Sequence, residues 1–167
     1  MITYIGLGSN LYQPAQQLKM ALEGIARIPQ SELLKVSSFY QSKALTLADS
    51  KAQNDYINAV VMLQTDLTAI QLLSELQAIE DQQGRIRTEK WSARTLDLDI
   101  LLFGEQIIAT NSLQVPHTQL AFRNFVIHPL FEIAGDINIP GQGALATLAG
   151  QTDWSGLNKL QRDCSHA

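Results

Sequence analysis

Residues 94–102 read RTLDLDILL, and this stretch completes the order of elements that decides the fold. Its leucines and isoleucine are typical of a buried β-strand, but Asp97 and Asp99 interrupt the apolar run. Because side chains at i and i+2 of a strand share a face about 7 Å apart, both carboxylates are expected to point the same way. The apolar residues beside them, such as Leu98, are expected to point toward a core on the other face.

Upstream of this strand, strand-like and helix-like segments alternate. Leu18, Ala21, Leu22 and Ile25 recur at helical spacing. Thr68, with a glutamine three residues later, has the pattern of a capping box at the start of a second helix. The sequence predicts strands at 2–8, 33–41, 56–65 and 94–102, and helices over 14–28 and from residue 69 to near 84.

The first six elements therefore run βαββαβ, which predicts the α+β class with a ferredoxin-like core: an antiparallel sheet with two helices on one face. Gly104 and Glu105 predict a tight turn that returns the chain along 106–109. Pro129 predicts the start of a short helix. We expect residues 1–167 to form a single domain, with a C-terminal extension of turns and short elements from about residue 136.

The two aspartates need a positive partner if they are buried. At an effective dielectric constant near 20, two charges at this spacing repel by roughly 2 kcal/mol, and desolvation beside apolar residues adds to that cost. A hard cation with oxygen ligands, Mg²⁺ above all, would relieve both terms. The alternative is a half-exposed edge strand whose aspartates face water, and the strand alone does not decide between the two.

The overall composition excludes some partners. The net charge of −4 argues against broad binding of nucleic acid or a membrane surface. Cys164 is the only cysteine, so an intrachain disulfide is impossible and a reducing compartment is expected. Apolar residues do not run long enough for a membrane span. We expect a cytoplasmic protein that binds neither nucleic acid nor membrane.

Basic residues gather just before the aspartates: Arg85, Arg87, Lys90 and Arg94. Arginines supply planar, charge-assisted donors for phosphate oxygens, so this cluster beside a metal site suits phosphoryl transfer. A solvated loop is the alternative.

The glycines in GLGSNL (6–11) resemble a dinucleotide fingerprint, but Leu11 replaces the third glycine. A tight strand-to-helix turn in which Gly6 and Gly8 allow close backbone approach is the preferred interpretation. Tyr56 and Asn58 share a strand face and could stack on and read a heterocycle, although core packing with a satisfied amide explains the same spacing.

The motifs together resemble those of the 6-hydroxymethyl-7,8-dihydropterin pyrophosphokinase family of folate biosynthesis. The resemblance rests on GLGSN, SSFY, DYINAV, IEDQQGRIR, KWSARTLDLDILLFG, VPH, RNFV and PLFEIA, in the family's order, over about residues 3–134. It implies a 2-amino-4-hydroxy-6-hydroxymethyldihydropteridine diphosphokinase. Such an enzyme transfers pyrophosphate from ATP, the co-substrate, to the pterin hydroxymethyl group and releases AMP. A monomer is expected.

The resemblance also implies roles for individual residues. Asp97 and Asp99 would coordinate two Mg²⁺ ions, and Arg87 and Arg94 would join them as catalytic residues. The residues expected around ATP are Gln77, Glu80, Arg85, Arg87, Trp91, Arg94, Ile100, His117 and Arg123. Those expected around the pterin are Ser42, Lys43, Ala44, Leu45, Tyr56, Asn58, Trp91 and Phe125, with Tyr56 and Phe125 stacking on the ring and Asn58 reading its edge.

Several positions depart from the family's usual pattern. Ser92 and Ala93 replace a common Gly-Pro pair, and Lys43 and Ala44 stand where prolines are frequent. These departures leave two other functions open: a non-catalytic module that binds a nucleotide or pterin, and a kinase for a different hydroxymethyl heterocycle.

Overall fold

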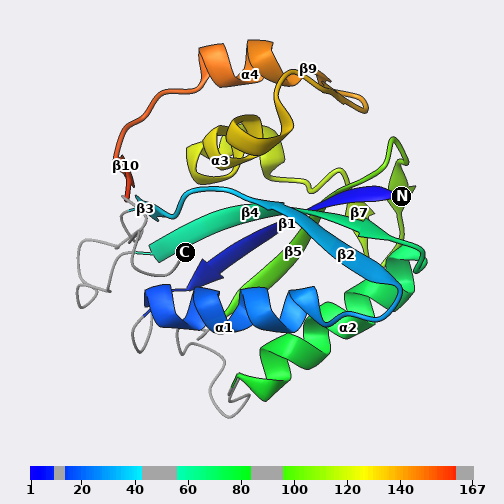
Figure 1. Ribbon diagram of the computed structural model, residues 1–167. Helices are drawn as coiled ribbons and strands as arrows, with labels where there is room; N and C mark the ends of the chain where they lie inside the picture. The colour runs from blue at the N-terminus through cyan, green and yellow to red at the C-terminus, as the bar shows by residue number, and fades with distance from the viewer. Residues whose placement is uncertain (10–13, 43–55, 84–95, 161–167) are drawn as a thin grey trace.

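The computed structural model describes residues 1–9, 14–42, 56–83 and 96–160. Its main sheet contains β1 (Ile2–Ser9), β2 (Ser31–Val36), β3 (Tyr40–Ser42), β4 (Tyr56–Thr65), β5 (Asp97–Phe103) and β10 (Leu157–Lys159). The strand order is β10-β3-β4-β1-β5, with β2 also paired to β4, and every pairing is antiparallel. With α1 (Pro14–Ala26) and α2 (Ala69–Gln82) on one face, this is the predicted ferredoxin-like core (Figure 1).

The two helices bury their apolar stripes against the sheet. Leu18, Ala21 and Ile25 of α1 are fully buried in the same cluster as Leu72 and Leu76 of α2. The predicted capping box at the start of α2 is present, with reciprocal bonds between the side chain of each partner and the backbone N–H of the other. The layer of α1 and α2 is therefore predictable from helical spacing and capping alone.

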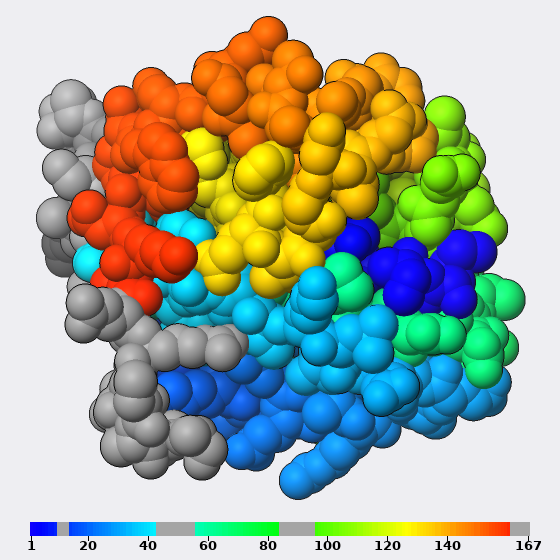
Figure 2. Space-filling view, turned by 45° about the horizontal axis from the view of Figure 1, so that its top comes forward, coloured from blue at the N-terminus to red at the C-terminus, as the bar shows by residue number. Residues whose placement is uncertain are grey.

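A second layer covers the opposite face of the sheet. It consists of α3 (Asn124–Ala134) and α4 (Leu145–Gln151), with Ile127 and Leu130 of α3 fully buried over the strands. The shorter elements are β6 (Ile108–Ala109), β7 (Gln114–Val115), the 3-10 turn η1 (Leu120–Phe122), β8 (Asn138–Ile139) and β9 (Gly143–Ala144). Figure 2 shows this yellow-to-red part of the chain spread over one face of the molecule.

The single strand predicted over 33–41 is wrong, because the structure divides it into β2 and β3. At Ser37 the side-chain oxygen, rather than a backbone carbonyl, accepts the hydrogen bond from Val60 N at 2.9 Å. The backbone N–H of Ser37 still donates to Val60 O at 2.9 Å. A hydroxyl thus replaces one member of the strand pairing and interrupts the strand.

The predicted two-residue turn at Gly104 and Glu105 is confirmed, since Gln106 N donates to Phe103 O at 3.1 Å across it and Gly104 has a φ of +56°. The N–H of Gly104 itself donates to Ile2 O at 2.8 Å. The returning segment forms β6 and pairs with β7, and Thr110 N donates to Leu113 O at 2.9 Å between them. The segment that follows the predicted turn therefore finds its strand partner in β7.

Two smaller expectations, for Pro129 and for the glycines at 6 and 8, also fail. Pro129 lies inside α3 rather than at its start, and burial of the flanking Val126, Ile127 and Leu130 holds the helix together despite the lost N–H. Gly6 and Gly8 lie within β1, which continues to Ser9, so they form no turn.

Within the described residues, no helix is both long and apolar enough to cross a membrane.

Candidate active site

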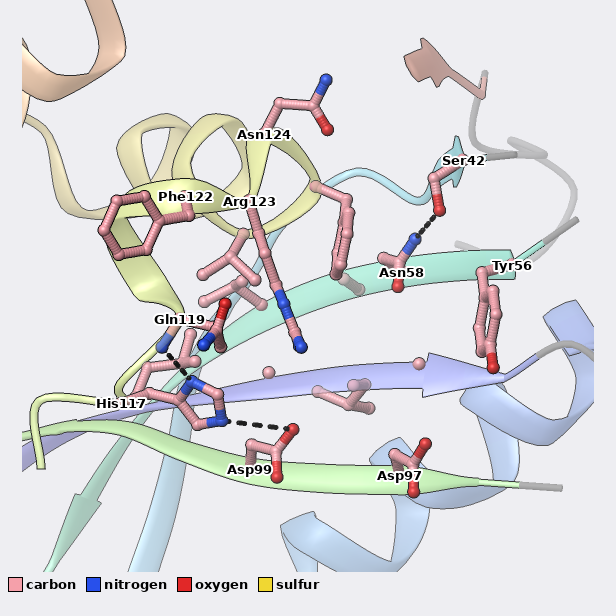
Figure 3. Close-up of a pocket in the computed structure, with 18 of the residues that line it drawn as sticks. Ser42, Tyr56, Asn58, Asp97, Asp99, His117, Gln119, Phe122, Arg123 and Asn124 are labelled. Atoms are coloured by element: carbon pink, nitrogen blue, oxygen red, sulfur yellow. Dashed lines mark hydrogen bonds and ion pairs between the residues drawn. The ribbon is translucent and has the colours of Figure 1, made fainter. Parts of the chain in front are cut away.

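A cavity of about 840 Å³ opens between the sheet and the first turn of α3, and this volume lies in the range of small-molecule pockets. Its floor comes from β1, β4 and β5, and its walls come from 117–126 and the segment 152–156 (Figure 3). The described residues that line it are Gly6, Leu7, Gly8, Ser42, Tyr56, Asn58, Ala59, Val60, Asp97, Asp99, Leu101, His117, Gln119, Phe122, Arg123, Asn124, Phe125, Val126, Thr152, Asp153, Ser155 and Gly156.

The floor of the cavity is acidic at one end. Asp97 and Asp99 pair with Gly8 and Gly6 of β1 and line the cavity, while Leu98 between them is buried in the core under the helices. The prediction that the two carboxylates share one face is confirmed. Strand β5 is an edge strand and the side chain of Asp99 is 51% exposed, as the alternative interpretation required, and both aspartates also line the open cavity.

A β-bulge connects this floor to a histidine. The register of β5 against β1 shifts by one residue at Leu101, so Leu101 lacks a partner on β1. Its carbonyl oxygen accepts a hydrogen bond from His117 N at 3.0 Å. The bulge thereby holds His117 over the sheet, with its Nε2 4.0 Å from Asp99 Oδ2.

The ring of His117 has a defined orientation. Its Nδ1 accepts a hydrogen bond from Gln119 N at 3.1 Å. A nitrogen that accepts carries no proton, so the neutral ring has its N–H at Nε2, on the side of Asp99. His117 can therefore offer an N–H donor beside the acidic floor.

Arg123 supplies the positive charge in this wall. It is the only lysine or arginine among the described residues that line the cavity. Its Cζ lies 5.5 Å from the ring centroid of Phe125, a cation–π distance. Figure 3 shows the side chain extending from the start of α3 toward the sheet. A cation and an aromatic face are thus presented together.

The other end of the cavity carries an amide. Asn58 is 5% exposed, and its Nδ2 donates to Ser42 Oγ at 2.8 Å. Tyr56 lies two residues away on the same strand and lines the same cavity. The predicted shared face of Tyr56 and Asn58 is confirmed, and the Ser42 bond fixes the direction of the amide.

Three predicted site residues lie outside this lining. Ile100 is 3% exposed in the core under the helices, and Gln77 is exposed on α2. Glu80 is 5% exposed, and its Oε2 accepts a hydrogen bond from Leu98 N at 2.8 Å. Glu80 thus binds the backbone of β5 at the residue between the two aspartates, on the edge of the sheet. A nucleotide-binding role for Gln77, Glu80 and Ile100 stays a prediction.

Seven further predicted residues lie outside the described part of the chain: Lys43, Ala44, Leu45, Arg85, Arg87, Trp91 and Arg94. Ser92 and Ala93 lie there too. The basic cluster before the aspartates therefore stays a prediction.

Sequence reasoning missed the C-terminal wall of the cavity. Thr152, Asp153, Ser155 and Gly156 line it, and Asn124 Nδ2 donates to Ser155 O at 3.0 Å. These four lining residues lie between the short elements α4 and β10, in a stretch without apolar periodicity. The available signal was Gly156 directly before β10, but the pairing of β10 with β3 spans more than a hundred residues.

The described residues suit a magnesium ion that takes most of its ligands from elsewhere. They contain no group of three or more His, Cys, Asp or Glu side chains that could hold a metal. Mg²⁺ is usually bound by one or two carboxylates together with substrate phosphates and water. Asp97 and Asp99 form such a partial, oxygen-only ligand set.

Comparison with known proteins identifies the family. The sequence model of 7,8-dihydro-6-hydroxymethylpterin-pyrophosphokinase (HPPK) matches residues 4–135. The chain belongs to the HPPK family. It is 49% identical over 152 residues to the 2-amino-4-hydroxy-6-hydroxymethyldihydropteridine pyrophosphokinase of Haemophilus influenzae, covering 90% of this chain and 93% of that protein. The same enzyme of Pseudomonas aeruginosa is 43% identical over 157 residues, covering 94% and 95%.

Solved structures agree on the fold. A Plasmodium falciparum HPPK-DHPS structure with pteroate superposes with a TM-score of 0.69 at 12% identity, covering 90% of this chain. This chain spans 42% of the length of that protein. All the predicted site residues of this HPPK chain lie within the span 4–135, whereas the C-terminal wall at 152–156 lies beyond it.

Proposed function

We propose that this chain transfers pyrophosphate from ATP to the hydroxymethyl oxygen of 6-hydroxymethyl-7,8-dihydropterin, releasing AMP, as a step of folate biosynthesis. Its membership of the HPPK family supports this function. The observation that carries the proposal is the cavity itself, where the aspartate pair and the Asn58 amide lie on one floor. One pocket thus offers both a phosphate end and a heterocycle end.

At the heterocycle end, the side chains suit a flat, polar ring. Tyr56 and Phe125 present aromatic surfaces to the cavity, and such surfaces stack favourably on a heterocycle. Asn58, oriented by Ser42, can exchange hydrogen bonds with the ring edge. A buried amide of this kind discriminates strongly against rings that lack the matching groups.

At the phosphate end, Arg123 and the Nε2–H of His117 are donors for phosphate oxygens. Asp97 and Asp99 would hold two Mg²⁺ ions. Bound there, magnesium would neutralise phosphate charge and orient the reacting oxygens. Attack by the pterin oxygen forms the new P–O bond at the β-phosphorus of ATP, and the bond to the α-phosphate oxygen breaks to give AMP. Fixing both substrates in one pocket reduces the entropic cost of this step.

The test is to incubate the protein with ATP, Mg²⁺ and 6-hydroxymethyl-7,8-dihydropterin and to quantify AMP against ADP. Pterin-dependent AMP is expected, and Asp99→Asn should abolish it. Asp66→Asn, an exposed carboxylate outside the cavity, is the matched control and should retain full turnover. Absence of AMP despite ATP binding would instead favour a binding module or a different heterocycle as substrate.

A single domain over 1–167, a monomer and a cytoplasmic location belong to the same proposal. The high coverage of both bacterial relatives supports one domain, since each is matched over more than nine-tenths of its length. Sedimentation of the purified protein would test the monomeric state.

A further inference from the structure

One carboxylate near the end of α3 connects three separate segments of the chain. Glu132 Oε2 accepts hydrogen bonds from Ser38 N at 2.7 Å and from Ser38 Oγ at 3.1 Å. Its Oε1 accepts a hydrogen bond from Tyr40 OH and lies 3.6 Å from Lys159 Nζ. Glu132 therefore joins α3 to the approach of β3, to β3 itself and to β10.

These contacts lie next to the heterocycle end of the cavity. Tyr40 and Ser42 occupy positions i and i+2 of β3, and they pair with Asn58 and Tyr56 of β4. Tyr40 is 2% exposed. Ser42 is the acceptor that orients the Asn58 amide at 2.8 Å. Any movement of β3 along or away from β4 would therefore change the direction of that amide.

Strand β3 has little to hold it by itself. It contains three residues, as does its outer neighbour β10, and both are joined to the sheet through short pairings. Strands of three residues have few backbone hydrogen bonds to fix their position, and the outer neighbour of β3 is itself a three-residue edge strand. Bonds from side chains of another layer therefore carry more of that task than they would in the centre of a sheet.

The charges around Glu132 favour a fixed arrangement. Burial alone would raise the pKa of Glu132, but the hydrogen bonds from Tyr40 and Ser38 and the charge of Lys159 outweigh burial and lower it. Burial, the bond to Glu132 and the negative charge of Glu132 all raise the pKa of Tyr40. At neutral pH, Glu132 is therefore a carboxylate and Tyr40 a phenol that donates to it, and charge-assisted bonds of this type are strong.

We propose that Glu132 is a positioning residue for the pterin end of the cavity, holding β3 through Ser38 and Tyr40 so that Ser42 keeps the Asn58 amide directed at the substrate ring. This inference rests on the proposed function. Glu132 touches no substrate itself, and its effect is confined to the end of the pocket that β3 and β4 form. The hydrogen bonds and the ion pair of Glu132 go to Ser38, Tyr40 and Lys159, and none of these residues belongs to the phosphate end built from β5 and 117–123.

The test compares Glu132→Gln, Glu132→Ala and Tyr40→Phe with the unmodified protein by titration calorimetry. The ligands are 6-hydroxymethyl-7,8-dihydropterin in the presence of α,β-methylene-ATP, and α,β-methylene-ATP alone. We expect the pterin Kd to rise at least three-fold in Glu132→Gln and further in Glu132→Ala, with the nucleotide Kd within two-fold. Glutamine keeps one acceptor for Ser38, so it should rescue part of the loss.

Ile25→Val is the control for a general loss of stability, since Ile25 of α1 is fully buried in the core on the face of the sheet opposite α3 and Glu132. It should leave both Kd values unchanged. An unchanged pterin Kd in Glu132→Gln and Tyr40→Phe, or an equal loss for nucleotide and pterin, would overturn the inference. If the unmodified protein neither binds the pterin nor forms AMP from it, the proposed function fails first, and the two failures are thereby distinguished.

Discussion

Replacing Gly8 with alanine would place a methyl group against the Asn58 amide, which we propose reads the pterin. A Cβ at Gly8 would lie 3.1 Å from Asn58 Oδ1, closer than ordinary van der Waals contact. Asn58 is 5% exposed and tied to Ser42, so the amide can yield only by stretching that bond. The change therefore acts on the orientation of Asn58.

The magnitude follows from the bond that is strained. A typical hydrogen bond contributes about 1 kcal/mol net, which corresponds to about a five-fold change in Kd. Gly8 has no positive φ, so alanine fits its backbone conformation and restricts the unfolded chain, a gain of about 0.4–1 kcal/mol. Pterin affinity should therefore fall about five-fold while the free energy of unfolding changes little.

Gly6→Ala is the matched control on the same face of β1. A Cβ at Gly6 would meet Leu101 Cδ2 at 3.4 Å, an ordinary contact with a flexible side chain. Calorimetric titration with the pterin and urea unfolding of both variants make the measurement. An equal pterin Kd in Gly8→Ala and the unmodified protein, or an equal loss in both variants, would refute the reasoning.

Four further variants test other parts of the structure. Asp97→Ala and Asp99→Ala should each abolish AMP formation while the circular dichroism spectrum stays native, and near-normal turnover in both would remove the metal assignment. Thr68→Ala removes the cap of α2 and should cost about 1 kcal/mol, seen as a fall in Tm of about 2–4 °C by calorimetry. Because the folded-state pKa of Glu132 is lowered, its stabilising contribution is present above the ordinary glutamate pKa and is lost as the pH falls through the folded value. Between pH 7 and pH 3, the free energy of unfolding measured in urea should therefore fall less in Glu132→Gln than in the unmodified protein. The same dependence of that free energy on pH in both proteins would contradict the assignment.

The fold was predictable where the pattern is local. Helical spacing in α1 and the capping box at Thr68 each involve residues within one or two turns, and the order of strands and helices then selects the ferredoxin-like core. The failures occur where a distant group decides. Val60 of β4 ends β2 by bonding to the side chain of Ser37, and β10 pairs with β3 across most of the chain.

The candidate site was predictable to a similar extent. The spacing of Asp97 and Asp99 fixes their common face, and that of Tyr56 and Asn58 fixes theirs, because strand periodicity is exact in such short stretches. The meeting of the two pairs in one cavity depends on β1 lying between β4 and β5, which no local pattern states. The part played by Glu132 was likewise invisible, since it requires knowing that α3 crosses β3.

The bulge at Leu101 places two consecutive residues of β5 on the same face of the sheet. Before the bulge, alternate residues of β5 face the cavity. At the bulge, Leu101 and Leu102 both pack beneath α3, and Phe103 then lies on the face covered by α1 and α2. Deleting Leu101 would therefore restore regular alternation, with Leu102 still beneath α3, Phe103 still on the side of α1 and α2, and the aspartates unchanged. The deletion would, however, remove the carbonyl oxygen that accepts a hydrogen bond from His117 N. The extra residue thus serves to anchor the histidine wall of the cavity above the aspartates, and its loss should free that wall without unfolding the sheet.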